Sequence, residues 1–131
     1  MKINIHNTKT LAPIAPGITK HFCRSAARLH GLLAFREQLN IAEETGHYAT
    51  FAEVEADMEE IKSNIAKLAN ICASLLSKMN ALANKFEVGA ICVDLNEASL
   101  SEVIDACNEY VDELVAQSDY RDWVEETANK F

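Results

Sequence analysis

The sequence has few residues that interrupt helices and no segment that resembles a membrane span. Only four glycines and two prolines occur in 131 residues, and their scarcity favours long helices because both residue types destabilise helix interiors. No apolar run approaches the roughly 20 residues that cross a bilayer. The N-terminal stretch is interrupted by Asn, Lys and both prolines, which is unlike a secretory signal. We therefore expect a cytoplasmic protein whose length fits one ordinary domain.

Paired cysteines and paired histidines are also missing. The four cysteines stand apart in the sequence, with no pair at the two-residue spacing of redox and metal motifs. No two of the four histidines lie three or four residues apart, so no pair of metal ligands would share one face of a helix. We predict reduced, buried thiols that pack as small apolar side chains, with no metal and no cofactor.

Acidic residues are absent from the first 36 positions, which carry six basic residues and hence a charge of +6. Residues 37–131 carry all twenty acids and six basic residues, a charge of −14, which gives the net −8 of the chain. Four basic residues fall on the first predicted long helix: Lys20, Arg24, Arg28 and Arg36. Like charges at four-residue spacing repel on a helix, so these cations either pack against the acidic part of the chain or bind an external anion.

The strongest pattern is an apolar residue at alternating intervals of three and four. The series is Phe51, Val54, Met58, Ile61, Ile65, Leu68, Cys72, Leu75, Met79, Leu82 and Phe86. This heptad spacing predicts one long central helix over about 50–86. At about 1.5 Å per residue it would be about 54 Å long, whereas a compact domain of this size is about 36 Å across. The helix must therefore bend, project or pair with a second copy.

Small, neutral residues lie opposite the heptad seam: Ala56, Ser63, Asn70, Ser77 and Asn84. A solvated coiled coil would carry Lys and Glu at these positions. We therefore expect other helices to surround the C-terminal half of the central helix.

The segment before the first long helix is predicted to be an extended arm over residues 1–17, because Pro13 and Pro16 disfavour both helix and central strand. Its first residues suit a short edge strand. The first helix then continues to about Thr45, with a bend or break at Gly31.

Beyond the central helix, Gly89 is the predicted helix stop. A capping box of Ser99 and Glu102 predicts a third helix over 99–117, and a short helix carrying Trp123 completes the chain. The predicted fold is all-α, a helical bundle of three to four helices around one long central helix, with residues 18–131 forming a single domain.

No motif for catalysis, phosphate binding or redox chemistry is present, which favours a non-enzymatic role. Acidic residues concentrate over 53–60 and 102–126, and such a surface suits a basic groove on another protein and speeds association. We predict a protein-binding protein such as a small inhibitor, an antitoxin-like neutraliser or a chaperone. Its predicted partner-binding residues are Glu53, Asp57, Glu60, Glu109, Asp112 and Glu113. Its composition is also common among accessory proteins of phages and mobile elements, although composition identifies no family.

Two alternatives stay open. The protein could assemble into a homodimer through its central helix as a structural protein. It could also bind nucleic acid through the four basic residues of the first helix, but the −14 of the remaining chain would repel phosphates, which makes nucleic acid the less favoured partner.

Overall fold

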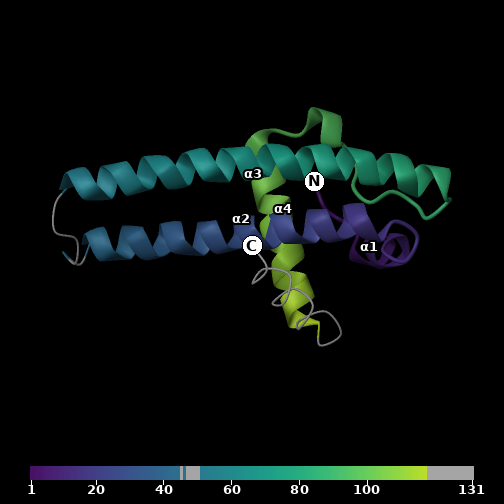
Figure 1. Ribbon diagram of the computed structural model, residues 1–131, viewed down its shortest axis with the longest axis horizontal. Coiled ribbons are helices and arrows are strands. Elements are labelled where there is room, and N and C mark those ends of the chain that lie inside the picture. Colours follow the sequence, from purple (N-terminus) through teal and green to yellow (C-terminus); the bar gives the residue numbers. More distant parts are fainter. Residues whose placement is uncertain (45, 47–50, 118–131) are drawn as a thin grey trace.

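Two long antiparallel helices dominate the computed structural model, which describes residues 1–44, 46 and 51–117, without the side chains of 43 and 51–54. Helix α2 (Pro16–Glu44) and helix α3 (Phe51–Lys85) form a hairpin, and helix α4 (Leu100–Ala116) crosses both near their middle (Figure 1). A short helix, α1 (Ile5–Leu11), precedes α2. The predicted all-α bundle around one long helix is confirmed, and the predicted bounds of that helix differ from α3 by one residue at each end.

The heptad seam of α3 faces the interior of the chain. Its central residues Ile61, Ile65, Cys72 and Met79 are all buried. The opposite side is exposed at each of the small neutral positions, including Asn70. The expectation that helices surround the C-terminal half of α3 is therefore wrong, because α2 and α4 both pack on the seam side and leave the far side to solvent.

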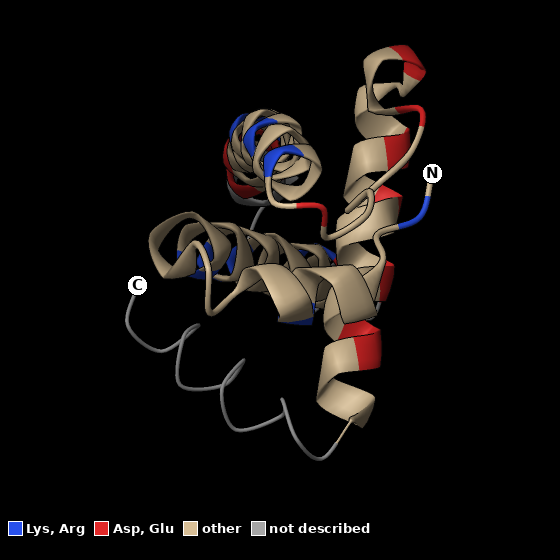
Figure 2. Ribbon diagram, turned by 90° about the vertical axis from the view of Figure 1, so that its right-hand side faces the viewer, with Lys and Arg blue, Asp and Glu red and all other residues tan. Residues whose placement is uncertain are grey.

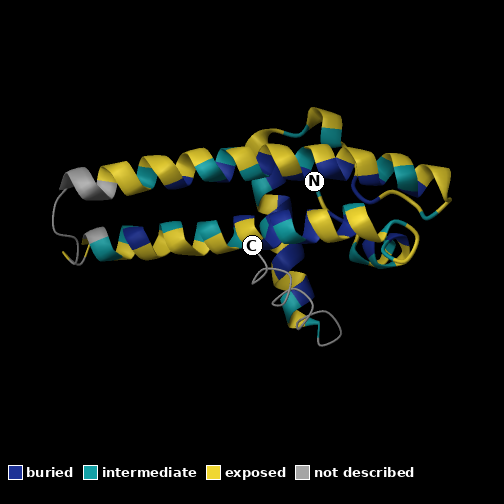
Figure 3. Cartoon of the chain, viewed as in Figure 1, coloured by how far each residue is buried: buried dark blue, intermediate teal, exposed yellow. Residues whose placement is uncertain are grey.

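The half of the hairpin formed by the end of α2 and the beginning of α3 extends away from α4 (Figure 1). We call this part, residues 31–44 of α2 and 55–65 of α3, the distal arm. It has only two helices, so most of its surface is exposed or half-buried (Figure 3). Among the described side chains of this arm, Leu39, Ile61 and Ile65 are the buried ones. A helix of 35 residues is about 52 Å long, and projection of this arm is how the chain accommodates that length.

Residues 1–17 are not an extended arm beyond their first residues. Asn4 caps α1 by accepting a hydrogen bond from the backbone N–H of Asn7 at 2.9 Å, and Pro16 occupies the first position of α2, where a missing N–H costs nothing. Only Ile3 pairs in extended form, in an isolated antiparallel bridge with Cys92. The prediction is wrong because a side-chain cap before the prolines lets seven residues form a helix.

Helix α2 runs unbroken through Gly31, so the predicted break at that residue is also wrong. Helix α3 ends earlier than Gly89. Glu87 adopts a left-handed backbone with φ 58°, and the N–H of Val88 donates to the carbonyl of Ala83 at 2.9 Å, which is the hydrogen bond that closes a helix C-terminus.

Between α3 and α4 lies a short 3₁₀ helix, η1 (Leu95–Glu97), that the sequence did not predict. Ser99 then caps α4 by accepting from the N–H of Glu102 at 3.3 Å, as predicted. The last short helix, predicted to carry Trp123, lies outside the described residues.

The core forms where α4 crosses the hairpin. Phe22 of α2 and Tyr110 of α4 pack their rings at 5.2 Å between centroids. All four cysteines are free and buried, as predicted. Among the described residues, no helix combines the length and apolarity needed to cross a bilayer.

Candidate functional site

The outer side of α4 presents a continuous row of carboxylates, which we call the acidic face. Its residues are Glu102, Asp105, Glu109, Asp112 and Glu113, all exposed. They recur at three- and four-residue intervals and therefore share one side of the helix, and α4 contains no Lys or Arg. Figure 2 shows these acids along the side of α4 that points away from the hairpin.

The buried side of α4 fixes the direction of this face. Val103, Cys107, Tyr110 and Leu114 are buried against the hairpin, and a helix anchored along this stripe cannot rotate without exposing it. The packing of this buried stripe therefore holds the carboxylates in solvent.

One member of the acidic face, Asp112, contacts helix α2. His30 Nε2 of α2 lies 2.7 Å from Asp112 Oδ1; the His30 side chain is 33% exposed and the Asp112 side chain 63%. An exposed pair of this kind contributes at most about 1 kcal/mol. It ties the end of the acidic face to α2 and leaves the other four carboxylates facing solvent.

The structure divides the predicted acidic residues into two groups. Glu109, Asp112 and Glu113 lie together on α4, whereas Asp57 and Glu60 are exposed on the distal arm, away from α4 (Figure 1). The side chain of Glu53 lies outside the described residues.

Sequence reasoning left Glu102 and Asp105 out of the candidate set, although both belong to the acidic face. Their spacing from Glu109 is the signal that would have identified them, because residues three, four and seven apart share a helix face.

The predicted basic residues do not form one surface. Lys20, Arg24 and Arg28 follow one another at four-residue intervals, but Arg36 lies about 80° around the helix from Arg28 and about 160° from Lys20. Lys20 and Arg28 are exposed, whereas the Nε of Arg24 is buried and makes no hydrogen bond. The three cations that share a side thus include one whose guanidinium is only partly accessible.

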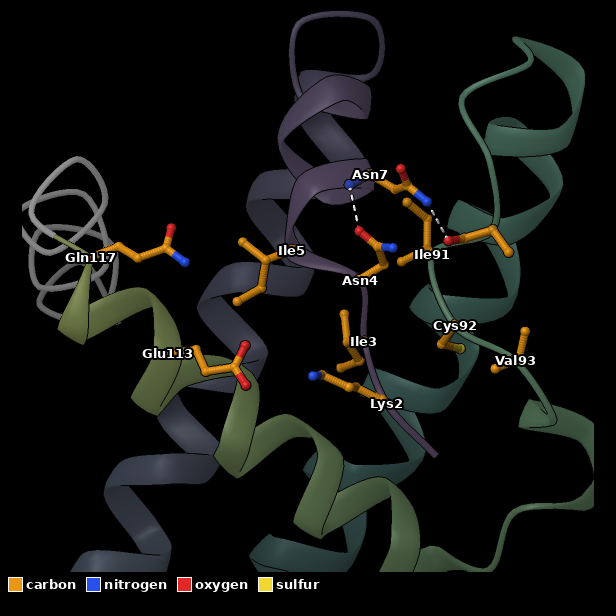
Figure 4. A pocket seen from close by; sticks show the side chains of 11 residues that line it. Lys2, Ile3, Asn4, Ile5, Asn7, Ile91, Cys92, Val93, Glu113 and Gln117 are labelled. Atoms are coloured by element: carbon orange, nitrogen blue, oxygen red, sulfur yellow. Dashed lines mark hydrogen bonds between the residues drawn. The ribbon is translucent and has the colours of Figure 1, made fainter.

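A cavity of about 590 Å³ opens beside the C-terminal end of the acidic face. The N-terminal segment, residues 90–93 and α4 form its walls (Figure 4). Ile3, Ile5 and Val93 supply apolar surface, and Lys2 and Glu113 lie at its polar side. The cavity can therefore receive an apolar group next to a carboxylate.

Hydrogen bonds from both sides hold the wall at residues 90–93. Asn80 of α3 accepts from the N–H groups of Ile91 and Cys92 at 2.9 and 3.0 Å and donates to the Cys92 carbonyl at 3.0 Å. From the other side, Asn7 Nδ2 donates to the Ala90 carbonyl at 2.8 Å. One partly buried asparagine thus accepts from the N–H groups of Ile91 and Cys92, while the Ile91 carbonyl accepts from the backbone N–H of Asn4 at 2.7 Å.

Cys92, which lines this cavity, does not carry an activated thiol. Burial raises the pKa of the Cys92 thiol, and the hydrogen bond from Asn80 only partly opposes that shift, so the thiol stays protonated and a poor nucleophile at neutral pH. Within the described ranges, no group of three or more His, Cys, Asp or Glu side chains is placed to hold a metal ion.

Comparison with known proteins found no matching family model, no matching curated protein and no matching solved structure.

Proposed function

We propose that this is a non-enzymatic protein-binding protein, an inhibitor, neutraliser or chaperone, whose acidic face on α4 engages a basic segment of another protein. The observation that carries the proposal is the unbroken row of exposed carboxylates on a helix with no basic residue. Such a row attracts a cationic surface and accelerates its association.

The neighbouring cavity supports binding rather than electrostatic attraction alone. Interfaces derive most of their affinity from a few apolar anchors seated in pockets, while charges set orientation and association rate. Glu113 belongs to both the acidic face and the cavity wall, so the two features adjoin. The ligand we infer is a segment with several Lys or Arg residues and one large apolar side chain.

Charge reversal at two locations tests this proposal. One variant replaces Glu102, Asp105, Glu109 and Glu113 with Lys; the control replaces Glu44, Glu55, Glu59 and Glu60, which are exposed on the distal arm. The two variants have the same net charge, so only the location of the change differs.

Both variants and the parent protein would be used to capture partners from the source cell, and each captured protein would be purified and titrated. We expect the α4 variant to lose at least about 100-fold in affinity, equivalent to about 2.7 kcal/mol, and the control to lose less than about threefold. Equal losses would mean that overall charge, not the acidic face, attracts the partner. Unchanged binding by the α4 variant at low salt would refute the proposal.

A further inference from the structure

We propose that a second copy of this chain docks antiparallel on α2, with Phe35 at the twofold axis. The surface is distinct from the acidic face of α4, so this inference does not depend on the proposed function. It also differs from a homodimer through the central helix, because the seam of α3 is filled by the chain's own helices.

The docking surface is a heptad-spaced row along α2 that we call the outer stripe. Its residues are Lys20, Arg24, Arg28, Gly31, Phe35, Gln38 and Ala42, at intervals of four and three that alternate from Arg24 onward. Alternating intervals of this kind line up along one side of a helix and suit pairing with another helix. Within the distal arm the stripe carries no charge.

Two large apolar side chains are exposed on the distal arm of α2. Phe35 is 49% exposed, and Ile41, beside the stripe, is 51% exposed. Around them Gly31, Ala34 and Gln38 are also exposed, and a Cβ added at Gly31 would meet no atom within 4 Å apart from its chain neighbours and the backbone of its own helix. Small residues flanking a phenylalanine allow another helix to approach closely.

Charge complementarity identifies the occupant and its direction. Residues 37–60, which include the end of the distal arm, carry eight acids and no Lys or Arg. Residues 16–36 of α2 carry four basic residues and no acid. Parallel pairing of two copies would bring two −8 ends together, whereas antiparallel pairing sets each acidic end against the basic half of the other copy's α2.

With Phe35 on the axis, a residue that precedes position 35 by a given number of residues in one α2 faces the residue that follows position 35 by the same number in the other copy. Arg28 then faces Ala42 of the second copy, next to the acidic end. Such a twofold contact is isologous, so each interaction occurs twice and the assembly closes as a dimer.

Sedimentation across a range of concentrations tests the proposal, with two matched variants. Phe35→Glu places two carboxylates at the axis and should weaken dimerisation at least about 30-fold. Phe86→Glu is the control, because Phe86 is similarly exposed, at 45%, but lies at the end of α3; it should change dimerisation less than about threefold. Circular dichroism of both variants checks that the helices are intact.

Spin labels on exposed introduced cysteines give the direction. With an antiparallel dimer centred on Phe35, the two labels at Gln38→Cys should lie about 9 Å apart along the axis and those at Glu44→Cys about 27 Å apart. Parallel pairing would make the two separations equal. Raising the salt concentration should weaken the antiparallel dimer, because its opposite charges attract.

A dissociation constant in the micromolar range would be visible at concentrations up to about 200 µM. If the protein is a strict monomer over this range, the proposal is overturned, and the outer stripe would then bind a different protein. Equal effects of Phe35→Glu and Phe86→Glu, or equal label separations, overturn it as well. Partner capture through the acidic face of α4 should be unaffected by Phe35→Glu, which keeps this test separate from that of the proposed function.

Discussion

Asn80 should contribute more to stability than any exposed polar residue of α3, and Asn80→Ala measures this. The substitution removes three hydrogen bonds to the backbone and a longer one to Cys92 Sγ at 3.6 Å, and it leaves the backbone groups of Ile91 and Cys92, both buried, without these partners. Each hydrogen bond to the backbone is worth about 1 kcal/mol net. Alanine recovers about 0.6 kcal/mol through its higher helix propensity. The expected loss in the free energy of unfolding is therefore about 2.4 kcal/mol.

Urea denaturation followed by circular dichroism is the appropriate assay, because the difference is obtained from the midpoint when the slope is unchanged. Asn84→Ala is the control: Asn84 is an exposed asparagine one turn later on the same helix, and its replacement should change stability by no more than about 0.5 kcal/mol.

Asn80→Asp separates hydrogen bonding from packing, because it keeps the shape and both acceptor contacts but removes the donor to the Cys92 carbonyl. At neutral pH this variant should be destabilised, since a carboxylate oxygen would face a carbonyl oxygen. Protonation at low pH restores a donor, so the difference from the parent should shrink there. A loss below about 0.5 kcal/mol for Asn80→Ala, or an aspartate variant as stable as the parent at neutral pH, would refute this account of the 90–93 segment.

Two further outcomes follow from the buried core. Burial raises the pKa of the Cys23 thiol from 9.0 to about 12, so the unfolded chain loses this proton at lower pH than the folded chain does. The free energy of unfolding should therefore be undiminished below pH 9.0. Between pH 9.0 and about pH 12 it should fall by up to about 1.4 kcal/mol per pH unit. Cys23→Ala should flatten that slope in urea titrations repeated at increasing pH, and an identical slope would contradict the shift. Met79 is fully buried, so Met79→Ala should lower the free energy of unfolding by about 3 kcal/mol. Ser77 is exposed, so Ser77→Ala should change it by no more than about 0.5 kcal/mol. Similar effects of the two substitutions would mean that the seam is not packed as described.

The sequence alone was sufficient to predict the helices that have long periodic patterns. The heptad from Phe51 to Phe86 predicted α3 to within one residue at each end, and the Ser99 cap predicted α4, because repeated burial of one face leaves a regular signature. It failed at the N-terminus, where Pro16 was treated as a helix breaker although proline suits the first position of a helix.

The exposure of the acidic face and of the outer stripe could not be predicted from local sequence patterns, because it depends on how distant segments pack. The spacing of Glu102, Asp105 and Glu109 already placed them on one side of a helix, yet that this side faces solvent depends on how α4 crosses the hairpin. The same holds for Phe35, whose exposure follows from α4 ending its contact with α2 before the distal arm.

Taken by itself, the sequence determined the three long helical segments, where the charge divides and that the thiols are buried, because these follow from periodicity and composition. Only the tertiary structure decided which helix faces remain in solvent. The neutral positions opposite the seam of α3, such as Asn70, are exposed although their sequence suits burial. The physical reason is that a helix can bury any sufficiently apolar or neutral face, and the crossing of α4 over one side of the hairpin selects which face is covered.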